Sequence, residues 1–146
     1  INKWDLAKET HLTGDYEQYL TRILPGLKYA PIAFTTATQS KNVQSVLDLA
    51  AELHKQATSQ IPTAKLNKAF ESIREKRFSS SKKTKSGRFK IYYATQIATN
   101  PLTILMFVND PNLFEEKHRK YIINKLRTTL GIDEVPIRLV SRSHRK

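Results

Sequence analysis

The sequence predicts two regions of different fold class: a helix-strand-helix fragment of an α/β fold, followed by an α+β domain of order α-β-β-α-β. Charge gives the first sign of this division. Residues 1–60 carry six basic and six acidic side chains, whereas residues 61–146 carry 19 basic and seven acidic ones. Such a shift is typical of a domain boundary, and Pro62 lies beside it. The spacing of apolar residues then predicts the individual elements.

The first region is predicted to form a helix, a strand and a second helix. Leu and Tyr side chains recur at helical spacing over residues 16–28, and residues 30–36 form a short apolar run typical of a buried strand. We expect Asn42 to cap the second helix. Because a parallel sheet needs further strands to cover both faces, this region can be the edge of an α/β fold but not a whole doubly wound fold.

The second region is predicted to contain a helix, a hairpin, a helix and a last strand. Thr63 is the expected N-cap of a helix that reaches about residue 77. Residues 88–97 alternate as a strand, with Tyr92 on the face opposite to one apolar set. That set is Phe89, Ile91, Tyr93, Thr95 and Ile97.

The remaining elements follow from turn and cap residues. Asn100-Pro101 turns the chain into a second strand at 102–108, the expected hairpin partner. Asp110-Pro111 opens a helix that Gly131 ends. A strand at 135–141 completes a three-stranded sheet with helices on one face.

Composition excludes several classes of site and protein. The 146 residues contain no cysteine, so a disulfide framework and a cysteine-based metal site are excluded. The four histidines lack ligand spacing, so we expect no metal and no catalytic residue. The longest aliphatic and aromatic run, 104–108, is far too short for a membrane span. We expect a cytoplasmic monomer with no membrane partner.

The formal charge of +12 lies entirely in the second region, and such an excess attracts polyanions. We therefore expect salt-dependent RNA contacts from clustered cations. The candidates are Lys82, Lys83, Lys85, Arg88, Lys90, Arg142 and Arg145. Tyr92 could stack on a base or pack beneath a helix.

The segment Asn2-Lys3-Trp4-Asp5 matches an Asn-Lys-x-Asp guanine-recognition turn. A carboxylate at Asp5 can accept two hydrogen bonds from guanine, whereas adenine has no matching donors. The stem of Lys3 can lie over the base, and Asn2 can tie this turn to a neighbouring loop. The expected neighbour contains Thr36 and Ala37. This place resembles the Ser-Ala-type turn of GTPases, which implies that the Ala37 N–H is directed at the guanine O6.

The whole chain resembles the C-terminal part of the Der (EngA) double-GTPase family. The supporting segments include 2–6, 29–32, KIYYATQ at 90–96, FVNDP at 107–111 and 136–139. The resemblance implies that residues 1–59 are the C-terminal portion of a second, P-loop type GTP-binding domain and that residues 60–146 are a KH-like domain. Thr36 stands where the family usually has Ser, and it keeps the hydroxyl.

Membership would imply a function in large ribosomal subunit biogenesis. The implied partners are rRNA, the large ribosomal subunit and the GTPase domains of the same chain. GTP or GDP and magnesium would be the cofactors of the longer parent, which would be a GTPase. An alternative remains open, in which the KH-like domain docks on those GTPase domains as a regulatory module and makes no RNA contact.

None of the four glycines lies in a G-x-x-x-x-G-K-[ST] phosphate loop. The sequence also contains no Asp-x-x-Gly motif for the γ-phosphate side of a GTPase site. We therefore expect this chain to hydrolyse no GTP and to hold no cofactor, with no micromolar GTP binding by calorimetry. The KH-like region also lacks the G-x-x-G pair that usually clamps RNA, so its RNA contacts would come from the cations above.

Overall fold

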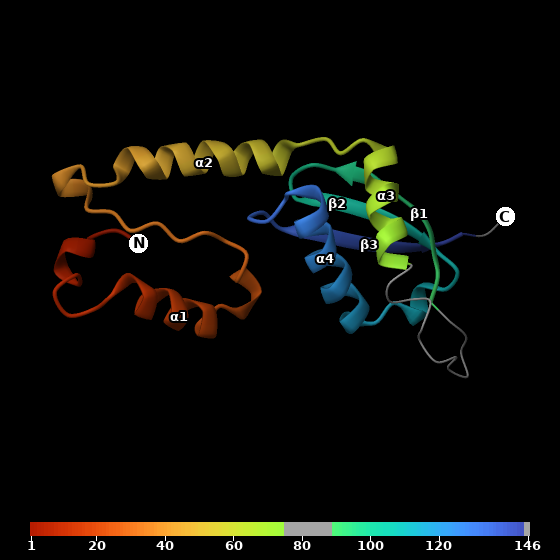
Figure 1. Cartoon of the computed structure of the whole chain (residues 1–146), viewed down its shortest axis with the longest axis horizontal. Coiled ribbons are helices and arrows are strands. Elements are labelled where there is room, and N and C mark those ends of the chain that lie inside the picture. The colour runs from red at the N-terminus through yellow and green to blue at the C-terminus, as the bar shows by residue number, and fades with distance from the viewer. Residues whose placement is uncertain (75–88, 145–146) are drawn as a thin grey trace. The chain divides into compact units, whose positions relative to one another are not determined.

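The computed structural model describes residues 1–74 and 89–144. Five predicted RNA-binding residues lie outside the described residues: Lys82, Lys83, Lys85, Arg88 and Arg145. The chain divides into two compact units, Ile1–Gln56 and Ala57–Lys146 (Figure 1). In the described parts of the chain, no helix combines the length and the apolarity needed to cross a membrane.

The first unit consists of short helical elements joined by extended chain. These are the 3₁₀ turns Trp4–Leu6, Pro25–Leu27 and Ala37–Gln39, with the helices α1 (Thr13–Ile23) and α2 (Val43–Thr58), the last of which continues past the unit boundary. The helix predicted over 16–28 ends before Pro25, because proline restricts the residue before it and lacks an N–H.

The strand predicted over 30–36 is not formed. Residues 31–35 have no regular secondary structure, and Thr35 bonds to the first residues of the chain: its N–H donates to Ile1 O at 2.8 Å, and its carbonyl oxygen accepts from Trp4 N at 3.0 Å. A strand requires a regular ladder with a neighbour, and the described residues of this unit supply none. Nearby, Asn42 has a left-handed φ of 58°, and its side-chain amide donates to Phe34 O at 3.0 Å.

The second unit has the predicted α-β-β-α-β order, and the α+β class is confirmed. Its elements are α3 (Thr63–Ile73), β1 (Ile91–Ala98), β2 (Leu102–Val108), α4 (Glu116–Leu130) and β3 (Ile137–Ser143). The sheet order is β1-β2-β3, with β1 antiparallel and β3 parallel to β2. Both helices cover the same face of the sheet (Figure 1).

Two predicted helix starts are wrong. Pro62 holds the N-cap position of α3, and Thr63 is its first helical residue. Asp110 does cap a helix, because its side chain accepts from Asn112 N at 2.9 Å, but this is the separate 3₁₀ turn Pro111–Leu113. The long helix starts after it, at Glu116, and ends as predicted at Gly131, whose φ is 68°.

The core of the second unit lies between the helices and one face of the sheet. Leu66 and Phe70 of α3, and Ile122 and Leu126 of α4, are at most 1% exposed. On β2 the alternate residues Leu102, Ile104, Met106 and Val108 are equally buried. This face of the sheet is therefore fully covered, as the alternation of a strand with one buried face requires.

A β-bulge interrupts β1. Ile91 pairs with Val108 and Tyr93 pairs with Phe107, so Tyr92 is an extra residue on β1. The bulge reverses the alternation: Ile91 and Ala94 face the core, whereas Tyr92 and Tyr93 are 46% and 40% exposed. The prediction that Tyr93 shares the face of Ile91 is therefore wrong.

Side chains of α3 and of its C-cap residue hold the outer edge of β1. Asn67 Oδ1 accepts from Ala94 N at 2.9 Å, and Asn67 Nδ2 donates to Ala94 O at 2.9 Å. Arg74 Nη1 donates to Ile91 O and Tyr92 O at 3.3 and 3.1 Å, where the bulge lies. These bonds satisfy backbone groups that an edge strand otherwise leaves open.

Candidate functional site

The two predicted base-recognition loops of the first unit lie together. Asn2 Oδ1 accepts hydrogen bonds from Lys3 N at 2.8 Å, Ala37 N at 3.1 Å and Thr35 Oγ1 at 3.3 Å. One amide oxygen thus joins segments that are more than thirty residues apart in the sequence. This is the tie between loops that the sequence predicts for Asn2.

Asp5 is held at the same junction through its backbone. Its N–H donates to Thr36 Oγ1 at 3.2 Å, and Thr36 is only 3% exposed. The Thr36 hydroxyl therefore has a structural role, because it holds the backbone of Asp5. Lys3 precedes the Trp4–Leu6 turn with a φ of 59° and is exposed. The left-handed backbone at Lys3 lets the chain turn sharply between Asn2 and Asp5.

Trp4 anchors this turn in a small aromatic cluster. Its ring lies 4.4 Å from the ring of Phe34 and 5.3 Å, edge to face, from the ring of Tyr16. Such pairs stabilise through both apolar burial and ring geometry. The Trp4 side chain therefore fixes the turn that carries Lys3 and Asp5.

The Ala37 N–H is already engaged. It donates to Asn2 Oδ1, so a guanine O6 at this position would have to share the donor with Asn2. The structure brings Asn2, Asp5, Thr36 and Ala37 into one hydrogen-bonded cluster. Guanine binding by this cluster stays a prediction.

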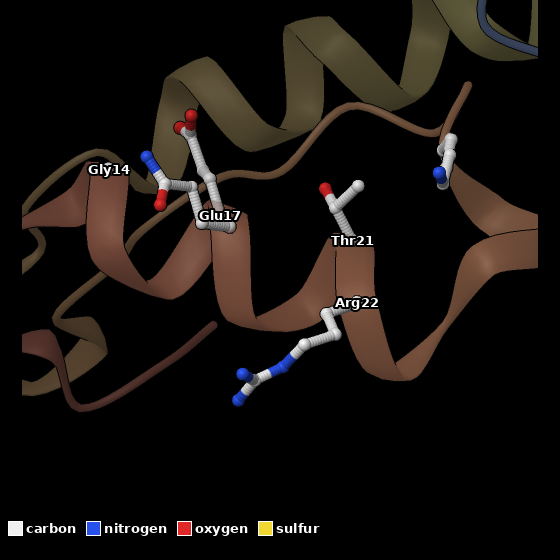
Figure 2. Close-up of a pocket in the computed structure, with 6 residues that line it drawn as sticks. Gly14, Glu17, Thr21 and Arg22 are labelled. Atoms are coloured by element: carbon white, nitrogen blue, oxygen red, sulfur yellow. The ribbon is translucent and has the colours of Figure 1, made fainter.

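A shallow depression of the first unit lies elsewhere, along α1 (Figure 2). It is lined by Gly14, Glu17, Gln18, Thr21, Arg22 and Lys28, none of which belongs to the two loops. Figure 2 shows Thr21 and Arg22 pointing to opposite sides of the helix. The described residues contain no group of three or more His, Cys, Asp or Glu side chains that could hold a metal ion.

In the second unit, two predicted RNA-binding cations are described. Lys90 is exposed just before β1, where its N–H donates to Asn109 Oδ1 at 2.7 Å. Arg142 is exposed on β3, in register with Phe107 of β2. No ion pair of the described residues involves either of them. Arg142 is thus a residue of the sheet rather than of a tail.

Tyr92 does not pack beneath a helix. It is 46% exposed, and its ring lies 5.0 Å from the ring of His144. Sequence reasoning missed Tyr93, Phe107, His144 and Arg138 as neighbours of this surface. The alternation of β3 could have indicated Arg138, since it lies between the buried Ile137 and Leu139, but nothing local signals the bulge that exposes Tyr93.

A comparison with protein families decides the relationship of the chain. The sequence model described as the KH-domain-like domain of EngA bacterial GTPase enzymes, C-terminal, matches residues 60–142. The chain belongs to this family. The predicted resemblance is thereby confirmed, and residues 60–142, which lie in the second unit, match the KH-like domain.

Curated relatives extend the similarity to the first unit. Proteins named GTPase Der from Natranaerobius thermophilus, Gloeobacter violaceus and Rhodopirellula baltica are 37%, 36% and 36% identical over 143, 144 and 139 residues. These alignments cover 97%, 97% and 95% of this chain but 32%, 31% and 30% of the relatives. The chain thus spans about a third of the length of the relatives it matches.

Proposed function

We propose that this chain is the C-terminal region of a Der-type GTPase and that its KH-like domain contacts RNA of the large ribosomal subunit during the biogenesis of that particle. The observation that carries the RNA contact is the charge distribution, since residues 61–146 hold 19 basic and seven acidic side chains. RNA phosphates are the polyanion that such a surface attracts in a ribosomal particle.

The first unit supplies the base-recognition part of a guanine nucleotide site. Asp5 accepts the N1–H and 2-amino group of guanine, and Lys3 lies over the base. Asn2, Thr36 and Ala37 hold the two loops in register through the hydrogen bonds at 3.1 and 3.2 Å. The phosphates and magnesium would bind residues of the longer parent, because no phosphate loop occurs in this sequence.

A titration of labelled rRNA and of an unrelated RNA tests the first proposal. Fluorescence anisotropy is measured with the whole chain at about 50 and 200 mM salt. We expect binding to both RNAs and a fall in affinity of at least tenfold at the higher salt, because phosphate neutralisation releases counterions. Absence of binding at the lower salt would contradict RNA contact and favour docking on the GTPase domains.

A nucleoside titration tests the second proposal without any phosphate contribution. Guanosine is expected to shift the backbone amide signals of Asp5 and Ala37 in NMR spectra of the whole chain, whereas adenosine leaves them in place. Asp5→Ala removes the acceptor for guanine and should abolish the shifts. Equal shifts with both nucleosides, or none, would contradict guanine recognition by these loops.

A further inference from the structure

The exposed apolar surface of the second unit is concentrated on one strand. Within its described residues, the large hydrophobic side chains that are exposed are Tyr92, Tyr93 and Ile97, at 46%, 40% and 54%. All three lie on β1. The bulge at Tyr92 causes the exposure of the two tyrosine side chains. Arg74 holds this bulge by donating hydrogen bonds to the carbonyl oxygens of residues 91 and 92.

The two tyrosines belong to a cluster of four rings, which we call the aromatic face: Tyr92, Tyr93, Phe107 and His144. The rings of Tyr93 and Phe107 stack at 4.3 Å with an angle of 16°. The His144 ring is 5.0 Å from that of Tyr92, and it meets the rings of Tyr93 and Phe107 edge-on at 5.8 and 6.4 Å. The rings thus support one another and remain partly open to solvent.

Strand register places the aromatic face on the side of the sheet opposite to the helices. Phe107 alternates with Met106 and Val108, which are fully buried under α3 and α4. Tyr93 pairs with Phe107, and Phe107 pairs with Arg142. A row of two aromatic rings and one guanidinium therefore crosses all three strands.

The charged side chains that the strands place on this side of the sheet are positive only. Arg138 pairs with Thr103 and lies on the same side as Arg142. The sequences of β1, β2 and β3 contain no Asp or Glu. Both arginines are exposed, and no ion pair among the described residues involves them. The rings thus have cationic neighbours suited to phosphate, and the three strands themselves carry no carboxylate that would repel it.

We propose that the aromatic face binds unpaired RNA bases by stacking, while Arg142 and Arg138 contact the neighbouring phosphates. This inference rests on the RNA contact proposed above and specifies its site and the form of RNA. Every base presents a π-face, so stacking on Tyr or Phe tolerates any sequence. A duplex keeps its base faces covered, so the site selects single strands, bulges or loops.

The experiment compares three labelled probes with the whole chain at about 50 and about 200 mM salt. The probes are a single-stranded RNA of about ten nucleotides, a duplex of the same length, and a single strand of the same backbone without bases. We expect the first probe to bind most tightly, because only this probe offers both phosphates and free base faces.

Variants locate the site. Tyr93→Leu keeps apolar bulk but removes the ring, and it should weaken binding of the single strand about tenfold while leaving the salt dependence unchanged. Tyr19→Leu is the matched control, since Tyr19 is 49% exposed on α1, and it should bind as the unmodified chain does. Arg142→Gln should weaken binding of all three probes and reduce the salt slope by about one.

The outcomes separate this inference from the proposed function. If the chain binds RNA with strong salt dependence but Tyr93→Leu and Phe107→Leu bind as tightly as the control, the aromatic face is not the site and the proposed RNA contact stands. If no probe binds at low salt, both the proposed RNA contact and the stacking on the aromatic face are contradicted, and a protein partner on this face is favoured. Thermal unfolding is recorded for each variant, and Tyr92→Leu, at the unpaired bulge residue, provides the same test if Tyr93→Leu unfolds.

Discussion

The two units of the chain differ in how they bury their apolar side chains. Every buried hydrophobic residue among those described lies between Leu66 and Leu139, in the second unit. In the first unit, the buried residue is the polar Thr36. Large side chains such as Leu6, Leu12 and Leu47 are 77%, 72% and 58% exposed there.

The difference follows from the elements that each unit contains. The second unit has a sheet whose buried face is covered by two amphipathic helices, and these two layers enclose a core. The first unit has helices and extended chain without a sheet in its described residues, so its helices find no common surface to cover. Polar bonds around Asn2 and the Trp4 cluster shape it locally, but such bonds contribute little net free energy.

Separating the units should reveal the largest difference in stability between them. Residues 57–146 alone are expected to unfold in one cooperative transition, because they contain the whole core. Residues 1–56 alone should show no cooperative transition. Urea unfolding followed by circular dichroism measures both. A cooperative transition of the shorter piece would break the comparison.

Matched leucines give the next largest effect. Leu66 of α3 is 0% exposed and Leu47 of α2 is 58% exposed. Leu66→Ala should lower the free energy of unfolding by about 2–5 kcal/mol, because it removes buried contacts and leaves a cavity. Leu47→Ala should change it by about 0.5 kcal/mol or less. Equal losses in chemical denaturation of the whole chain would show that Leu47 is buried in solution.

Matched glycines give the smallest effect. A Cβ on Gly131 or Gly26 would meet no atom within 4 Å, but only Gly131 has a positive φ, of 68°. Gly131→Ala should therefore cost about 1–2 kcal/mol through backbone strain alone. Gly26→Ala should be neutral within about 0.5 kcal/mol. Thermal melts compare the two, and a neutral Gly131→Ala would mean that the end of α4 rearranges.

Sequence reasoning succeeded where the signal is local. The hairpin strand 102–108 is correct to the residue, because its apolar run and the preceding Asn100-Pro101 turn are both visible in the sequence. It is less accurate at Asp110, where the cap signal predicts a single long helix although the chain forms a short 3₁₀ turn first. The strand expected at 30–36 failed because pairing depends on a partner strand and not on the run itself.

The candidate sites show the same limit. The motif and the family resemblance predict that Asn2 and Asp5 approach Thr36 and Ala37, and hydrogen bonds join these residues. Arg142 was foreseen as a cation, but its place beside Phe107 was not. The charges of residues are countable, whereas their neighbours across a sheet depend on register.

By itself, the sequence determined the division by charge and the α-β-β-α-β order, because composition, periodicity and caps act over a few neighbouring residues. The resemblance to the family came from motif segments such as KIYYATQ at 90–96 and not from these patterns. Only the tertiary structure decided which side of the sheet each tyrosine occupies. One extra residue at position 92, held by Arg74 from another element, reverses the alternation of β1. The alternation of apolar residues along a strand does not indicate such a shift, because a bulge is defined by the pairing with the neighbouring strand.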